Sequence, residues 1–146
     1  MTDRATLEAL LARVLEGEGW DAKLNADIAV TLGGWQRKWH DSERPHGWYW
    51  RRGEYSWTAE GEGYPADYLG SLDAVLRDLL PEGWGWAIST TGDLVPCAYG
   101  HSPDRSFWVD DTKAATPARA VCAFALRARI WIALQISGGK DEPLGN

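Results

Sequence analysis

Residues 35–58 read WQRKWHDSERPHGWYWRRGEYSWT, and aromatic side chains alternate there with long polar ones. A period of two that is carried by aromatic residues is typical of β-strands. The breaks at Pro45-His46-Gly47 and at Gly53-Glu54 fit turns, so the segment predicts two or three short antiparallel strands. It also holds five of the ten tryptophans of the chain. An indole provides a large contact area and one N–H donor, which suits both a core and a binding site.

Amphipathic helices are predicted on both sides of this segment. Near the amino terminus, apolar residues recur at the spacing of one helix face, at Leu7, Leu10, Leu11, Val14 and Leu15. A second helix is expected between Asp21, which is a favourable N-cap, and the glycine pair Gly33-Gly34, which is a typical helix stop. A third helix is expected to begin after Ser71 and to stop at Pro81.

The last predicted helix begins after Thr116 as N-cap, with Pro117 at its first position, and runs to about Ile136. One arc of the helical wheel is apolar and holds Val121, Phe124, Ala125, Ala128, Ile132 and Ile136, whereas the opposite arc holds Arg119, Ala123 and Arg127. Further strands are predicted at 84–89, 94–99 and 106–109, with turns between them.

These elements predict an α+β fold, a three-layer α-β-α sandwich with a mostly antiparallel sheet of four to six strands. A chain of 146 residues fits one domain that buries roughly two thirds of its unfolded surface. We expect a single domain over residues 1–139 and a flexible tail over residues 140–146, which are polar.

Charge and composition exclude several classes of protein. The formal charge of −6 opposes binding to extended nucleic acid, which needs a positive surface. No apolar run is long enough to span a bilayer, and the amino terminus lacks the order of a signal peptide, so a cytoplasmic protein is expected. Cys97 and Cys122 show no metal-ligand spacing, and we expect both to be free, buried thiols.

A candidate binding site lies in the aromatic segment, where tryptophans and arginines alternate: Trp48, Trp50, Arg51, Arg52 and Trp57. Alternation places the first two indoles on one face of a strand. A nucleotide base could stack on an indole while a guanidinium binds its phosphate, and a sugar ring could use the same platform.

The alternative is that these indoles pack beneath the helices, because tryptophan is often largely buried. The arginines would then pair with nearby carboxylates, at Glu54, Glu60 or Glu62. Trp84 and Trp86 share a face of a later predicted strand, and for these two we expect burial in the core.

No catalytic, metal or cofactor motif stands out. His40, His46 and His101 lack the spacing of metal ligands. The segment Gly100-His101-Ser102-Pro103-Asp104 offers the residue types of a hydrolase, but turn chemistry explains the same residues. We therefore expect a protein that is not an enzyme.

Two pairs of stretches resemble the phage ABA sandwich domain, a family of small phage and prophage proteins of unknown function. They are residues 68–74 with 80–86, and residues 115–123 with 125–129. The resemblance implies α-β-α layering and a viral origin, and the family supplies no activity to transfer. Residues 46–64 depart from the family pattern, so a role specific to this chain is expected there.

The preferred hypothesis is a phage- or prophage-encoded accessory protein in the host cytosol. It would bind an unknown protein partner or a small nucleotide-like ligand through the Trp/Arg-rich segment. A second hypothesis is a structural or assembly protein of the virion, whose exposed tryptophans form a subunit interface in a homo-oligomer. A third is a small hydrolase centred on His101.

Overall fold

The computed structural model describes residues 3–41, 47–53, 56–59 and 65–138, which form four helices and six strands. In chain order these elements are α1 (Arg4–Glu16), α2 (Ala22–Thr31), β1 (Gln36–His40), β2 (Gly47–Arg52), β3 (Ser56–Ala59), α3 (Leu72–Asp78), β4 (Gly85–Thr90), β5 (Pro96–His101), β6 (Trp108–Lys113) and α4 (Pro117–Gly138).

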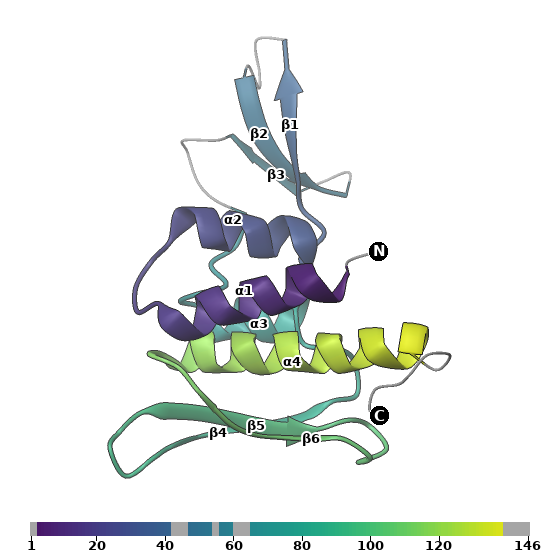
Figure 1. Ribbon diagram of the computed structural model, residues 1–146. Coiled ribbons are helices and arrows are strands. Elements are labelled where there is room, and N and C mark those ends of the chain that lie inside the picture. The colour runs from purple at the N-terminus through teal and green to yellow at the C-terminus, as the bar shows by residue number, and fades with distance from the viewer. Residues whose placement is uncertain (1–2, 42–46, 54–55, 60–64, 139–146) are drawn as a thin grey trace.

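The strands form two antiparallel sheets, in the orders β1-β2-β3 and β4-β5-β6. The helices lie between the two sheets, and β1–β3 projects beyond α2 on the side away from β4–β6 (Figure 1). The predicted α+β sandwich with antiparallel sheets is confirmed. The strands do not form the single sheet of four to six strands that was expected between the helices. Helix α3 follows β3 and packs on α4, which puts β4–β6 on the far side of the helices.

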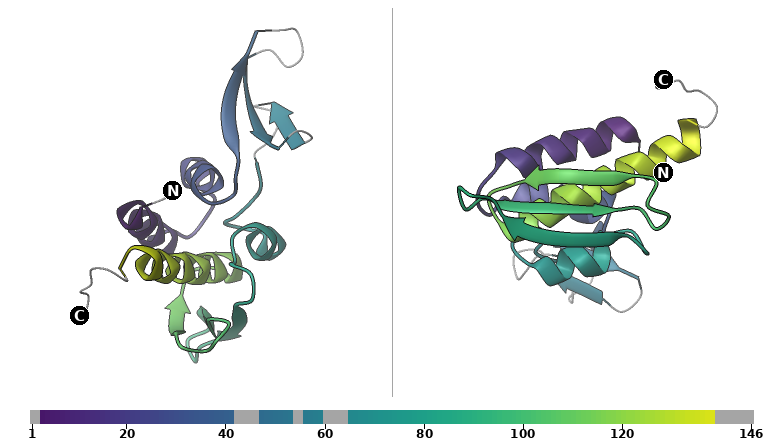
Figure 2. Two further views of the ribbon diagram at one scale, coloured as in Figure 1. Left: turned by 90° about the vertical axis from the view of Figure 1, so that its right-hand side faces the viewer. Right: turned by 90° about the horizontal axis from the view of Figure 1, so that it is seen from below.

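Helix α4 is the centre of the core. It packs against α1 and α3 on one side and against β5 and β6 on the other (Figure 2). Every residue from Ala120 to Leu126 is fully buried. The prediction that Arg119 and Ala123 face away from the core was therefore wrong, because helices and sheet cover α4 on all sides at this level.

The buried Arg119 has a structural task. Its Nη1 donates to the carbonyl oxygen of Val14, at 2.9 Å, and its Nη2 donates to that of Gly19, at 2.5 Å. A guanidinium at a helix C-terminus satisfies carbonyls that have no partner within the helix. Arg119 thus fixes the end of α1 to the first turn of α4.

Side chains at the helix starts confirm the predicted N-caps. Asp21 accepts from the backbone N–H of Leu24, Ser71 from that of Ala74, and Thr116 from that of Arg119. Each bond satisfies one of the N–H groups that a helix start leaves open.

None of the helices that the structure describes is long and apolar enough to cross a membrane.

Candidate functional site

Strand β2 is the centre of the projecting sheet, and its pairing fixes which side chains share a face. Trp39 of β1 lies opposite Trp48, and Arg37 lies opposite Trp50. Residues directly opposite each other in an antiparallel pair point to the same side. One face therefore carries these four residues, together with Arg52 two positions further along β2.

The outer end of this face is an exposed cluster of two indoles and a guanidinium. The rings of Trp39 and Trp48 meet edge to face, with centroids 5.5 Å apart. Arg37 places its Cζ 4.2 Å from the centre of the Trp48 ring. The exposed fractions of Trp39 and Trp48 are 52% and 43%. We call Arg37, Trp39 and Trp48 the indole–guanidinium surface.

The inner end of the same face is buried against the helices. Trp50 is only 8% exposed and belongs to the hydrophobic core. The guanidinium of Arg52 lies 4.9 Å from the centre of the Trp35 ring, and its Nη1 lies 2.8 Å from Oδ2 of Asp78. This end of the face therefore attaches the sheet to α3 and to the end of α2.

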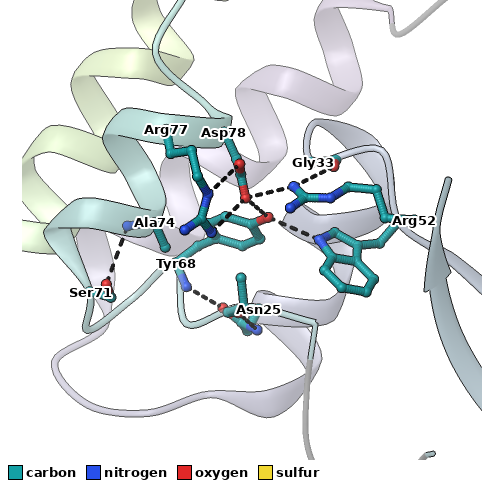
Figure 3. Close-up of polar contacts among 10 residues, drawn as sticks. Asn25, Gly33, Arg52, Tyr68, Ser71, Ala74, Arg77 and Asp78 are labelled. Atoms are coloured by element: carbon teal, nitrogen blue, oxygen red, sulfur yellow. Dashed lines mark hydrogen bonds and ion pairs between the residues drawn. The ribbon is translucent and has the colours of Figure 1, made fainter. Parts of the chain in front are cut away.

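Asp78, at the end of α3, receives hydrogen bonds from several elements. Arg77 and Arg52 approach its carboxylate from opposite sides, and Tyr68 donates its hydroxyl to Oδ2 at 2.7 Å (Figure 3). The indole N–H of Trp35 donates in turn to the Tyr68 oxygen, at 3.2 Å. We call these five residues the Asp78 network.

Protonation in this network is set by burial and by the hydrogen bonds. Burial alone would raise the pKa of Asp78, but the bonds from Arg77, Tyr68 and Arg52 outweigh it and hold the pKa at about 2. Burial and the adjacent carboxylate raise the pKa of Tyr68 above its ordinary value. At neutral pH a neutral phenol thus donates to a charged carboxylate, which is a stable structural arrangement.

Asn25 of α2 holds the segment before α3 in place. Its Nδ2 donates to the carbonyl oxygen of Ala66, at 2.6 Å, and its Oδ1 accepts from the backbone N–H of Tyr68, at 2.7 Å (Figure 3). With both groups of the buried amide satisfied, α2 and α3 fix the position of the network to which β2 is attached.

The five residues of the predicted binding site are not gathered on one surface. Trp48 is exposed, whereas Trp50 and Arg52 lie at the buried inner end. Arg51 is on the opposite face, and its Nε donates to the Gly53 carbonyl at 2.6 Å. The backbone of Trp57 pairs with that of Arg51, and its side chain lies outside the described residues, as do Glu54, Glu60 and Glu62.

Two residues of the exposed cluster, Arg37 and Trp39, were not among the predicted site residues. The alternation of β1 was visible in the sequence, but the register that brings Trp39 opposite Trp48 was not. A turn fixes the register of a hairpin, and residues 42–46 gave no turn type specific enough to fix it.

The residue types of a hydrolase at 100–104 are engaged in a turn before β6. The Ser102 hydroxyl donates to Asp104, at 2.8 Å, and accepts from the backbone N–H of Phe107, at 3.1 Å. Nδ1 of His101 lies 2.8 Å from the carbonyl oxygen of Ser102. Bonds from the backbone and side chain of Ser106, and from Ser102, lower the pKa of Asp104 to about 2. These contacts are those of a structured turn.

The cysteines are free and buried, as predicted. Burial raises the pKa of Cys122 to about 12 and also raises that of Cys97, which disfavours the thiolate that a nucleophile needs. Among the described residues, no three His, Cys, Asp or Glu side chains lie close enough together to hold a metal ion.

The later tryptophans differ from each other in burial. Trp84 is buried as predicted, where its ring meets those of Phe124 and Trp131 edge to face. Trp86, for which burial in the core was also expected, is 40% exposed. β4 is an edge strand, so part of the ring extends past the helix that covers the centre of the sheet.

Comparison of the chain with models of known families, with curated proteins and with solved structures finds no match. The resemblance to the phage ABA sandwich domain therefore stays a prediction.

Proposed function

We propose that this chain is a phage- or prophage-encoded accessory protein that acts by binding a partner through the indole–guanidinium surface. The main support for this proposal is that Trp39 and Trp48 contact each other and still keep about half of their surface exposed. They do so on a sheet that projects away from the helices (Figure 1). The viral origin is supported by the motifs at residues 68–86 and 115–129.

Exposed indoles supported by a rigid base favour binding. Each exposed apolar Å² forgoes roughly 25 cal/mol of stabilisation that burial would give. Tryptophan and arginine are the residues most enriched where contacts carry binding energy. The Asp78 network anchors β2 next to this surface, so little ordering is needed when a partner binds.

Local charge favours an anionic partner. Among the described residues, Arg37 is the charged member of the surface. Lys38 and Arg51 lie on the other face of the sheet, and Arg52 is paired with Asp78. The surface lies on the open face of a strand pair, a geometry that suits the surface of another protein more than an enclosed small molecule. An acidic, partly apolar protein surface is therefore the preferred partner.

A nucleotide-like ligand is the second candidate, because a guanidinium and two indoles share one face. A base could stack on the Trp39 ring while Arg37 binds a phosphate. Small ligands of this kind do not require a positive charge over the whole protein.

The test compares the double variant Trp39→Ala/Trp48→Ala with a control, Trp20→Ala, whose indole is equally exposed but lies between α1 and α2. Each protein is used as bait in an extract of bacterial cells. We expect wild type and W20A to retain the same protein and the double variant to lose it. Equal retention by all three would contradict the proposal for a protein partner.

The nucleotide candidate is tested by NMR of the wild-type protein, to which cyclic dinucleotides are added. Shifts confined to the indole N–H signals of Trp39 and Trp48 would support it. Unchanged signals with every nucleotide would exclude it and leave the protein partner.

A further inference from the structure

A groove lies at the other end of the molecule, between α1, α4 and β6, with a volume of about 370 Å³. Its α4 wall is the stripe Arg127, Ile130, Trp131 and Leu134, which recurs at the spacing of one helix face. The Trp131 ring stacks on that of Phe107, with centroids 5.1 Å apart. The groove is thus an aromatic and aliphatic trough.

The polar groups at the groove are mainly acidic. Glu8 of α1 and Asp110 of β6 line it, and Glu8 also pairs with Arg4 at 2.8 Å. The one basic residue among the lining residues, Arg127, donates Nη1 to Thr112 at 3.1 Å and is within 3.5 Å of the Asp110 carbonyl oxygen. This guanidinium is therefore bound to β6, and Glu8 shares its charge with Arg4, so Asp110 is the carboxylate that a cationic occupant would meet.

We propose that the occupant is a second copy of this chain, which inserts its indole–guanidinium surface into the groove. The match is one of both shape and charge. A volume of about 370 Å³ lies at the lower end of the roughly 300–1,000 Å³ range of binding pockets, so an indole ring fits. Arg37 would then lie near the carboxylate of Asp110, and Trp39 and Trp48 would meet apolar walls.

The contact joins different copies because the two surfaces lie at opposite ends of one molecule. The β1–β3 sheet lies beyond α2, whereas the groove borders β6 on the other side of α4 (Figures 1 and 2). A contact between two different patches is heterologous, and its repetition gives a ring or an open chain of copies. This inference rests on the proposed function, since it names the partner of the same surface.

The first experiment measures mass by sedimentation velocity as the wild-type concentration rises to about 1 mM, where even weak contacts are populated. We expect the mass to rise above that of the monomer and the rise to weaken with added salt, because the attraction includes exposed charges. A monomer at all concentrations would overturn the proposal.

Two variants remove one surface each, and each has a matched control. Trp39→Ala/Trp48→Ala removes the rings and is compared with W20A. Leu134→Glu places a carboxylate in the groove and is compared with Ile136→Glu, which lies on the same helix but does not line the groove. We expect self-association to weaken about tenfold or more in the first member of each pair. Weakening that is equal in variant and control would contradict the proposal.

Mixing the two defective variants gives the decisive result. The double variant keeps an intact groove, and L134E keeps an intact indole–guanidinium surface. A heterologous contact therefore predicts a 1:1 complex in the mixture, although each variant alone is a monomer. If mixing restores nothing, the intact groove of one variant does not bind the intact indole–guanidinium surface of the other, and the proposal is wrong.

The two proposals fail in different ways. If the wild type stays monomeric but still retains a protein that the double variant loses from the cell extract, self-docking fails and the proposed function stands. If the double variant behaves as wild type in both experiments, the surface itself is wrong.

Discussion

Trp48 and Trp50 lie two residues apart on one strand and on one face, yet one is 43% exposed and the other 8%. The arginines next to these two indoles also differ in whether they lie at the surface or at the buried end of the sheet. Arg37 covers the exposed ring, whereas Arg52 reaches Asp78 beneath the sheet. Alternation thus determines which side a residue faces, but the length by which a sheet extends past its supporting helices determines burial.

The comparison separates an anchor from a contact surface. The inner end holds the sheet to α2 and α3 through a core indole and the Asp78 network. At the outer end, Trp39 and Trp48 lie outside the hydrophobic core and present their rings on an open strand face. A protein that binds through a projecting sheet needs both, because a loosely held sheet would lose conformational entropy on binding.

The largest effect is expected when this comparison is tested by single truncations. Trp50→Ala should lower the free energy of unfolding by about 3–5 kcal/mol, since it opens a cavity in the core. Trp48→Ala should lower it by less than about 1 kcal/mol, because the ring is half exposed and mainly contacts Trp39 and Arg37. Urea unfolding measures both. Similar losses of unfolding free energy in the two variants would show that this face is not divided into a buried inner end and an exposed outer end.

A somewhat smaller loss, about 3 kcal/mol, is expected for Asp78→Ala. The change leaves the guanidinium of Arg52 and the hydroxyl of Tyr68 without their acceptor at a largely buried position. Arg77→Ala is the comparison variant, because Arg77 is mostly exposed and its pair is worth little. A loss in R77A as large as in D78A would contradict the central place of the carboxylate.

Several features of the fold were predictable from local sequence. Asp21, Ser71 and Thr116 were expected as caps and are caps, because capping needs only neighbouring backbone groups. The strand positions followed from alternation and turns. These signals are short in range, and the structure confirms them.

Contacts between distant segments were not predictable in this way. Arg52 and Asp78 are separated by 26 positions with no pattern that links them, and Arg119 looked like a surface residue on the helical wheel. The exposed cluster was found only in part, since Trp48 was expected but Arg37 and Trp39 depend on strand register. Tertiary packing decides all of these positions.

The pH dependence of stability gives a further contrast. The pKa of Asp78 is lowered to about 2 in the folded protein, below its ordinary value of 3.8. The charged carboxylate therefore stabilises the fold fully above pH 3.8, and this stabilisation is lost as the pH falls toward 2. Wild type should therefore lose more stability than Asp78→Ala between about pH 4 and pH 2. Thermal melts across this range check the difference, and parallel curves would contradict it.

The smallest effect on stability is expected at the outer end. Arg37→Ala should cost about 0.5–1 kcal/mol, the value of an exposed cation–π contact. It should nevertheless weaken partner retention in the extract experiment, because the Arg37 guanidinium contributes to the binding surface although it contributes little to the stability of the fold. An R37A protein with unchanged retention would remove the guanidinium from the proposed surface.

The division of this face is tested most directly by NMR of the ten indole N–H signals with a soluble paramagnetic agent. The account predicts that the signals of Trp39 and Trp48 broaden strongly while those of Trp35 and Trp50 stay sharp. Equal broadening of all four, or protection of Trp48 equal to that of Trp50, would contradict it.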